Sequence, residues 1–269
     1  MKRSFLFLMS LLLLSLSGTG CGLLNIPATT TPTDIPTTTL TPVPTATIDW
    51  FPATPTAGRT PISTPLPLPT PELGLGEVLL ADGLAPAQAW ELPRTTTGTA
   101  SLSEGVLTLA VQAERGYLTS LRIEPQFGDF YLEVTAATSL CRQADSYGLL
   151  LRAASTGDTY RWVITCDGQT RLERIRGGFA SLVYDWVYSA QIRPGAPAEH
   201  LLAVWMAGSE IRFFINGYEQ FSPREPVFTS GGVGFFARAS ADSPVTVSFS
   251  GLSVRTVDIR LLPTKTPAQ

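Results

Sequence analysis

The sequence predicts an all-β protein, an antiparallel β-sandwich of the jelly-roll type preceded by a disordered Thr/Pro-rich linker. Apolar and polar residues alternate with a period of two through most of the chain after residue 77. Clusters of Gly, Asn, Asp, Ser and Thr separate these runs, and none has the spacing of a helix longer than a turn or two. Strands of this kind present one apolar face each, so two sheets must stack to enclose a core.

Composition divides the chain into four segments. We assign residues 1–21 to a lipoprotein signal peptide, 22–76 to the linker, 77–261 to the β-sandwich domain and 262–269 to a disordered tail. The domain has about 185 residues, enough to bury a core of its own. The net charge is −3 and no basic stripe is visible, which argues against nucleic acid as a partner. No second long apolar run follows the N-terminus, so no further membrane segment is expected; we also expect a monomer.

The first 21 residues have the order of a secretory signal. Lys2 and Arg3 precede an apolar run from Phe5 to Leu16, which is too short to span a bilayer. Small residues then lead to Cys21, and this arrangement resembles the lipobox of bacterial lipoproteins, although Gly18 stands where Leu is usual. The resemblance implies a diacylglycerol thioether on Cys21, cleavage before it, and a chain exported and anchored to the bacterial membrane with its domain outside. The alternative is a plainly cleaved signal that leaves Cys21 as a free thiol.

The linker is rich in Thr and Pro. Residues 27–71 contain 12 Pro and 15 Thr. Proline removes backbone donors and fixes φ, so neither helix nor sheet is expected, and an extended polyproline II conformation is favoured. We interpret the segment as a spacer that holds the domain away from the membrane. The Thr hydroxyls are either unmodified or carry O-glycans.

The domain contains runs of residues typical of strands. The clearest are 106–111, 130–135, 147–152, 160–165, 201–206, 211–215, 233–238 and 245–249. Turn signals separate them, among them Asn216-Gly217, which suits a type I′ hairpin because both residues tolerate positive φ. We expect about 10 to 13 strands, spaced as in sandwiches and jelly rolls.

The order of several short motifs resembles concanavalin A-like jelly rolls of the LamG and glucanase type. The motifs are 127–132 (FGDFYL), 147–152 (YGLLLR), 160–164 (YRWVI), 208–217 (GSEIRFFING) and 231–235 (GGVGF). They are most similar to the branch that includes 3-keto-disaccharide hydrolase domains of secreted bacterial proteins. The resemblance covers most of residues 80–256 and is specific for the fold. It implies a carbohydrate-directed function, because that family acts largely on carbohydrates.

Two cysteines remain in the domain if Cys21 takes lipid. Cys141 would end the strand that starts at Phe130, and Cys166 the strand that starts at Tyr160. An even pair in an exported domain is expected to oxidise, so we predict a disulfide between them. The alternative is two buried free thiols.

Catalytic and metal-binding patterns are weak. The single histidine, His200, precedes an apolar strand without a nucleophile motif, and we expect it at a rim or strand edge. Glycoside hydrolysis needs two converging carboxyls. Asp129 and Glu133 share a face of one strand, but about 13 Å would separate their backbones. The Glu-x-Asp-x-x-Glu and Glu-x-Asp-x-Glu patterns of related glucanases are absent. The sequence therefore favours a protein without catalysis, cofactor or metal.

Aromatic and arginine residues are the candidates for ligand binding. They are Arg152, Tyr160, Trp162, Arg174, Tyr184, Trp186 and Tyr188. Period-two alternation places Tyr160 and Trp162 on one strand face, and Tyr184, Trp186 and Tyr188 on one face of another. One interpretation is that these faces line a groove in which the arginines donate to a sugar; the other is that the rings belong to the core.

The function that fits these features is a surface-tethered, non-catalytic binding module, with carbohydrate as its partner. The fold resemblance, the linker and the missing carboxylate pair motivate it. A glycoside hydrolase-like enzyme and a structural or protein-interaction module are the two alternatives.

Overall fold

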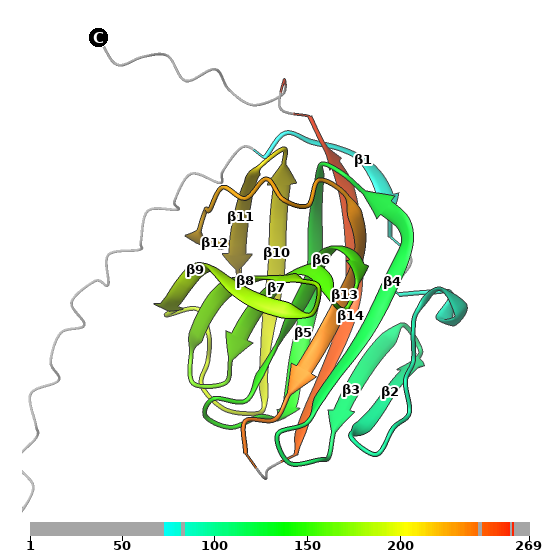
Figure 1. Cartoon of the computed structure of the whole chain (residues 1–269), viewed down its shortest axis with the longest axis vertical. Helices are drawn as coiled ribbons and strands as arrows, with labels where there is room; N and C mark the ends of the chain where they lie inside the picture. The colour runs from blue at the N-terminus through cyan, green and yellow to red at the C-terminus, as the bar shows by residue number, and fades with distance from the viewer. Residues whose placement is uncertain (1–72, 82–83, 242–243, 259, 261–269) are drawn as a thin grey trace, which may run out of the picture. The chain divides into compact units, whose positions relative to one another are not determined.

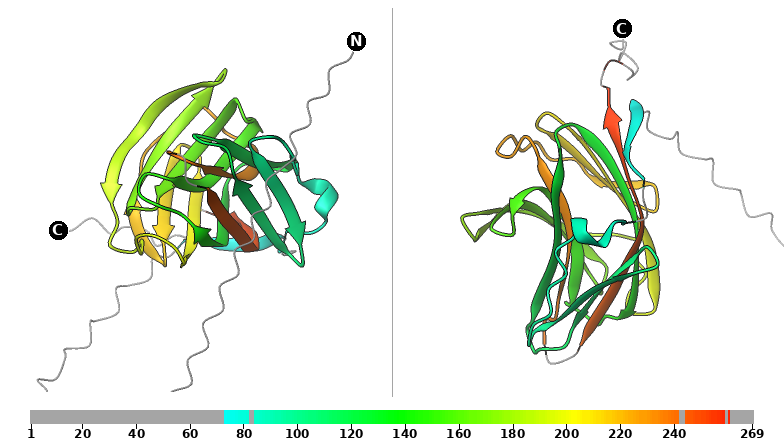
Figure 2. Two further views of the ribbon diagram at one scale, coloured as in Figure 1. Left: turned by 90° about the horizontal axis from the view of Figure 1, so that it is seen from below. Right: turned by 90° about the vertical axis from the view of Figure 1, so that its right-hand side faces the viewer.

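The computed structural model describes residues 73–81, 84–241, 244–258 and 260. In these residues two antiparallel sheets stack face to face, which confirms the predicted β-sandwich (Figures 1 and 2). The signal peptide, Cys21, the tail and nearly all of the linker lie outside the described residues. The expectations for these segments therefore stay predictions.

The larger sheet has eight strands in the order β12-β11-β10-β5-β14-β3-β2, with β1 paired to β14. Its strands are β1 (Leu75–Leu80), β2 (Gly98–Ser103), β3 (Val106–Val111), β5 (Phe130–Leu140), β10 (Ala198–Ala207), β11 (Glu210–Ile215), β12 (Tyr218–Phe221) and β14 (Val245–Val257). The long strands β5 and β14 pair with each other at its centre, although more than a hundred residues separate them in the sequence (Figure 1).

The smaller sheet has six strands in the order β4-β13-β6-β7-β8-β9. Its strands are β4 (Tyr117–Phe127), β6 (Ser146–Ser155), β7 (Asp158–Thr165), β8 (Gln169–Arg176), β9 (Phe179–Tyr188) and β13 (Gly231–Arg238). Strands β6 to β9 follow one another as hairpins, whereas β4 and β13 join from distant parts of the chain. The edge strands of this sheet are therefore β4 and β9.

The core lies between the sheets and follows from the period-two pattern. In β5 the residues from Phe130 to Thr138 alternate strictly between buried and partly exposed. The inward side chains of both sheets form one continuous apolar cluster that includes Leu149, Trp162 and Phe235. Burial of one face of each sheet supplies the main driving force for this fold.

Fourteen strands are present in the described residues, slightly more than the sequence suggested. Asn216 and Gly217 form the β11–β12 turn with φ of 52° and 81°, as the Asn-Gly prediction required. The only helical element in the described chain is the 3₁₀ turn η1 (Ala87–Ala89), and no described helix is long and apolar enough to cross a membrane.

The sandwich begins slightly before the expected start at residue 77. Strand β1 starts at Leu75 and pairs with β14. The carbonyl of Leu73 accepts a 2.8 Å hydrogen bond from the indole of Trp205, which is buried on the outer face of the larger sheet. These contacts attach the last linker residues to the domain.

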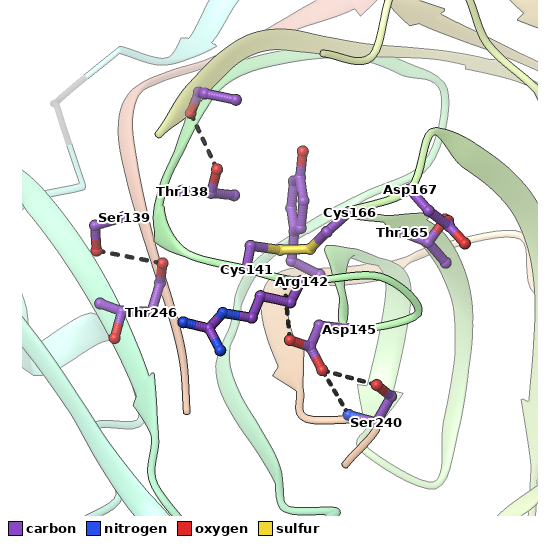
Figure 3. The surroundings of a disulfide bond; sticks show 12 residues. Thr138, Ser139, Cys141, Arg142, Asp145, Thr165, Cys166, Asp167, Ser240 and Thr246 are labelled. Atoms are coloured by element: carbon purple, nitrogen blue, oxygen red, sulfur yellow. Dashed lines mark hydrogen bonds between the residues drawn. A yellow bond between two sulfur atoms is a disulfide. The ribbon is translucent and has the colours of Figure 1, made fainter. Parts of the chain in front are cut away.

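The predicted disulfide is present and joins the two sheets (Figure 3). Cys141 directly follows β5 of the larger sheet, and Cys166 directly follows β7 of the smaller one. Asp145 organises the loop between them. Its buried carboxylate accepts hydrogen bonds from the backbone of Arg142 and from the backbone and hydroxyl of Ser240, and its carbonyl accepts from Cys166.

Candidate ligand-binding pocket

A pocket of about 240 Å³ opens on the outer face of the smaller sheet. Its lining residues are Tyr117, Ala144, Ser146, Arg161, Val163, Thr165, Arg171, Glu173, Trp186, Phe236, Arg238 and Ser240. All six strands of the sheet, or the loops next to them, contribute to this lining. Because the face opposite the core carries these residues, the pocket is independent of the packing that holds the two sheets together.

The floor of the pocket is apolar. Val163 and Phe236 belong to a small buried cluster on the outer face, together with Leu121 and Leu150. Gly148 lies in register between Val163 and Phe236, where a Cβ would come within 1.9 Å of the Trp162 carbonyl oxygen. The backbones of β6 and β7 can approach this closely only because residue 148 has no side chain.

A carboxylate bridges two arginines on one wall of the pocket. Glu173 on β8 is almost fully buried, and its oxygens pair with the guanidinium groups of Arg161 and Arg171. The Arg161 Nε donates to Glu173 at 2.7 Å. Arg161 lies opposite Glu173 in the β7–β8 register and Arg171 lies opposite Val163, so strand pairing places all three charges on the outer face. The network holds both guanidinium planes in fixed orientations.

Two aromatic rings reach the pocket from the two edge strands. Trp186 on β9 is 38% exposed, and the Arg171 guanidinium carbon lies 4.2 Å from the centre of its ring. Tyr117 on β4 is 36% exposed, with Arg161 5.6 Å from its ring centre. Burial raises the pKa of the Tyr117 phenol, against the opposing effect of Arg161, so the hydroxyl is neutral at physiological pH.

Arg238 adds a third cation at the end of β13. It lies in register with Tyr117 and Ser146, its side chain is exposed, and no described carboxylate forms an ion pair with it. The pocket therefore has three arginines and one glutamate, a formal excess of two positive charges in a chain whose net charge is −3. Because the pocket is positively charged, it attracts anions even though the protein as a whole is acidic.

The sequence prediction placed Tyr184, Trp186 and Tyr188 on one face of β9, and this is wrong for Tyr184. Register shifts occur on both sides of Leu172, where β8 pairs with β9. They turn Tyr184 inward, where its ring stacks on Phe221 of the other sheet at 4.5 Å, while Trp186 points to the pocket. Tyr188 is 68% exposed at the end of the same strand and does not line the pocket.

Arg152 lies inside the fold and not in the pocket. Its side chain is fully buried, and its five N–H donors are all used. They make hydrogen bonds to the carbonyls of Gly128, Gly208 and Phe228 and to the Asp129 carboxylate. Arg152 thus fastens three loops to one end of the sandwich and has no donor left for a ligand.

Three other candidates also face the interior, and the core interpretation expected this for the two rings but not for Arg174. Tyr160 and Trp162 have no exposed surface, and the Trp162 indole donates to the Thr170 hydroxyl at 2.6 Å. Arg174 points to the same side and makes two 3.1 Å hydrogen bonds to the Glu225 carboxylate. Of the seven residues singled out in the sequence, only Trp186 lines the pocket.

Paired catalytic carboxyls are not found in the pocket. Glu173 is the one carboxylate among its described lining residues. Asp129 instead accepts from the Gly208 backbone and Arg152, and Glu133 accepts from the Tyr131 hydroxyl on the other sheet. Within the described chain no three His, Cys, Asp or Glu side chains cluster as metal ligands would.

His200 is not at a rim, contrary to the sequence prediction. It lies in β10 between two paired strands and is only 2% exposed. Its Nε2 accepts from the Arg193 backbone at 3.0 Å, so Nδ1 holds the proton and donates to the Tyr147 hydroxyl at 3.0 Å. Burial lowers the pKa of His200, which keeps the ring neutral.

Most pocket residues were missed from the sequence, although a signal was available. The charged residues Arg161, Arg171 and Glu173 alternate with the large apolar residues Trp162 and Leu172 on neighbouring strands. In a sandwich the apolar phase faces the other sheet, so the phase with Arg and Glu faces outward. The prediction from aromatic residues alone chose Tyr160 and Trp162 on β7, which face the core, and not the outward residues of that strand.

No protein-family model matches the sequence, and no curated protein matches it. Solved structures do resemble it. The carbohydrate-binding module CBM66 from Bacillus subtilis is 14% identical, with 62% of this chain and 96% of that chain covered and a TM-score of 0.43. A Bacillus subtilis protein of unknown function with a galectin-like fold is 16% identical, with 68% and 97% covered and a TM-score of 0.49.

A third similar structure is that of Crh5 transglycosylase without ligand. It is 13% identical, with 70% of this chain and 87% of that chain covered and a TM-score of 0.48.

Proposed function

We propose that this protein is a carbohydrate-binding module whose ligand site is the outer pocket of the six-stranded sheet. The observation that carries the proposal is the combination of Tyr117 and Trp186 with the Arg161–Glu173–Arg171 network around an apolar floor. Sugar rings present apolar C–H faces that pack on aromatic rings, and hydroxyls that hydrogen-bond to oriented polar groups. Both kinds of partner converge in this pocket.

The rigidity of the site supports binding. Glu173 orients two guanidinium groups before any ligand arrives, and the stack on Trp186 fixes the second of them. Preorganised donors lose little conformational entropy on binding, which improves affinity for a polar ligand. The buried side chain of Ser146 provides a further polar group at the pocket wall.

Binding is tested by affinity electrophoresis of the full chain through gels that contain single polysaccharides, neutral and acidic, followed by titration calorimetry. We expect retardation by at least one polysaccharide, and Trp186→Ala should reduce its affinity about ten-fold or more because stacking area and the support of Arg171 are both lost. Tyr218→Ala is the matched control, since Tyr218 is an exposed ring on β12 of the other sheet. Equal affinities of the two variants would contradict the assigned site, and the absence of any retardation would contradict the function.

A binding role fits the pocket better than hydrolysis. Acid–base hydrolysis of a glycosidic bond uses two carboxyls on either side of that bond. Both carboxylate oxygens of Glu173 are engaged by arginines, one by Arg161 and the other by Arg171, so neither is free to act on a glycosidic bond. A protein-interaction role would be favoured by a face without aromatics, and this face carries Tyr117, Trp186 and Phe236.

We also propose that the domain is displayed outside the cell by a lipid on Cys21 and the Thr/Pro-rich spacer. The motivation is the signal-like run from Lys2 to Cys21 and the composition of residues 27–71. Metabolic labelling with a palmitate analogue should mark the wild-type chain. Cys21→Ser should lose the label and move from the membrane fraction to the medium, and a labelled Cys21→Ser chain would contradict the proposal.

A further inference from the structure

The charge of the pocket points to a narrower class of ligand than carbohydrate in general. Arg161 and Arg171 share the single carboxylate of Glu173, and Arg238 has no carboxylate partner among the described residues, so the pocket keeps a formal excess of two positive charges. A recess with more cations than anions attracts an anionic group, because the nearby positive charges raise the local potential.

The arginines differ in how many donors are free. The Arg161 guanidinium is occupied by Glu173 through Nε and Nη2. Arg171 is held by Glu173 through Nη2 and lies over the ring of Trp186, and no described residue accepts a hydrogen bond from its Nη1. Arg238 has neither an ion-pair partner nor a hydrogen-bond acceptor among the described residues. Arg171 and Arg238 are therefore the residues with donors available to a ligand.

We propose that this pocket recognises the carboxylate of an acidic sugar, so that its preferred ligand is a polysaccharide that contains uronic acid; the inference rests on the proposed function. A guanidinium is planar and presents paired N–H donors whose spacing matches the two oxygens of a carboxylate. The sugar ring lies over the apolar floor of Val163 and Phe236, beside Tyr117, while its carboxylate meets Arg171 and Arg238. A neutral hexose would fill the same space and leave these cations unpaired.

Polygalacturonate and its fully methyl-esterified form are the test ligands, since esterification removes the charge and keeps the polymer. Dissociation constants are measured by calorimetry with the full chain at physiological ionic strength, where weak long-range attraction is screened. We expect polygalacturonate to bind at least ten-fold more tightly than the ester, because a charge-assisted pair is lost in the ester.

Arg238→Gln should weaken binding of polygalacturonate about ten-fold and weaken binding of the ester less, so that the preference for the acid over the ester shrinks. Arg224→Gln is the matched control. Arg224 is exposed beside β11 of the other sheet, so this substitution removes the same charge away from the pocket residues. Because Arg238 is exposed and unpaired, the variant should keep the wild-type circular dichroism spectrum and melting temperature.

Four results would overturn the inference in distinguishable ways. If the ester binds as tightly as the acid, the ligand is a neutral sugar, and the proposed function stands without the acidic specificity. If Arg224→Gln and Arg238→Gln weaken binding equally, the attraction is that of a general polyanion. If a sulfated galactan binds and polygalacturonate does not, the recognised group is sulfate. If no polysaccharide of any charge binds, the proposed function fails as well.

Discussion

The guanidinium of Arg171 lies 4.2 Å from the ring centre of Trp186, so the edge strand β9 and its neighbour β8 meet in a cation–π stack at the mouth of the pocket. Glu173 pairs with the same guanidinium through its Nη2. One arginine therefore connects the aromatic wall of the pocket to its charged wall.

This arrangement predicts a fluorescence signal. Of the five tryptophans, Trp50 lies outside the described residues, Trp90, Trp162 and Trp205 are buried, and Trp186 is half-exposed at the pocket. A bound saccharide should change the solvent access of Trp186, so titration should alter the tryptophan emission, and Trp186→Phe should abolish that change while the variant still unfolds cooperatively. If the change persists in Trp186→Phe, the ligand does not contact this residue.

Glu173→Gln should destabilise the domain by about 2–3 kcal/mol, because the substitution leaves two partly buried guanidinium groups without a counter-ion. Urea unfolding at neutral pH measures the effect. Asp258→Asn is the comparison, since it breaks an exposed ion pair with Arg260 and should leave the unfolding midpoint unchanged. Equal midpoints for wild type and Glu173→Gln would show that the network has no structural role.

Arg152→Lys should cost about 2–4 kcal/mol of unfolding free energy, since lysine cannot satisfy the carbonyls of Gly128, Gly208 and Phe228 together with Asp129. The saccharide affinity of the folded variant should be that of wild type, because Arg152 is absent from the pocket lining. Arg176→Lys, an exposed change on β8, serves as the control for stability. If Arg152→Lys loses saccharide affinity and Arg176→Lys does not, Arg152 takes part in binding and this prediction is wrong.

Loss of the Cys141–Cys166 disulfide should lower the unfolding free energy by about 3 kcal/mol, because the bond closes a loop of 25 residues in the unfolded chain. The measurement is urea unfolding of the wild-type chain with and without reductant, and of the Cys141→Ser/Cys166→Ser variant. Reductant should leave the variant unaffected. If reductant shifts the variant as much as the wild type, the effect does not come from this bond.

The buried His200 predicts acid sensitivity. Its pKa in the folded protein lies below the value near 6.5 of an unfolded chain, so the unfolded state binds more protons between these two values. The contribution to stability is complete above about pH 6.5 and declines as the pH falls below it. Protonation would also place a proton on Nε2, so that two N–H donors would point at each other and the hydrogen bond from the Arg193 backbone would be lost.

Urea midpoints of wild type and His200→Gln at pH 7.5 and pH 5 separate this effect from that of the carboxyl groups. The wild type should lose more stability between the two values than His200→Gln does, because glutamine does not titrate. Identical losses would show that His200 does not cause the acid sensitivity.

The sequence by itself determined the sandwich, the Asn216-Gly217 turn and the pairing of Cys141 with Cys166. These features depend on local chemistry: a period-two pattern has one apolar face, positive φ selects Asn and Gly, and an even pair of thiols oxidises.

Only the tertiary structure decided which residues of the edge strands and of β13 line the pocket. The register shifts around Leu172 put Tyr184 and Trp186 on opposite sides of β9, and no local propensity marks these shifts. Tyr117 and Arg238 reach the pocket from β4 and β13, which strand pairing brings to β6 and β7 from far along the chain. Side-chain alternation is a property of the single strand, whereas a pocket depends on register between strands, and register is set by the packing of the whole sheet.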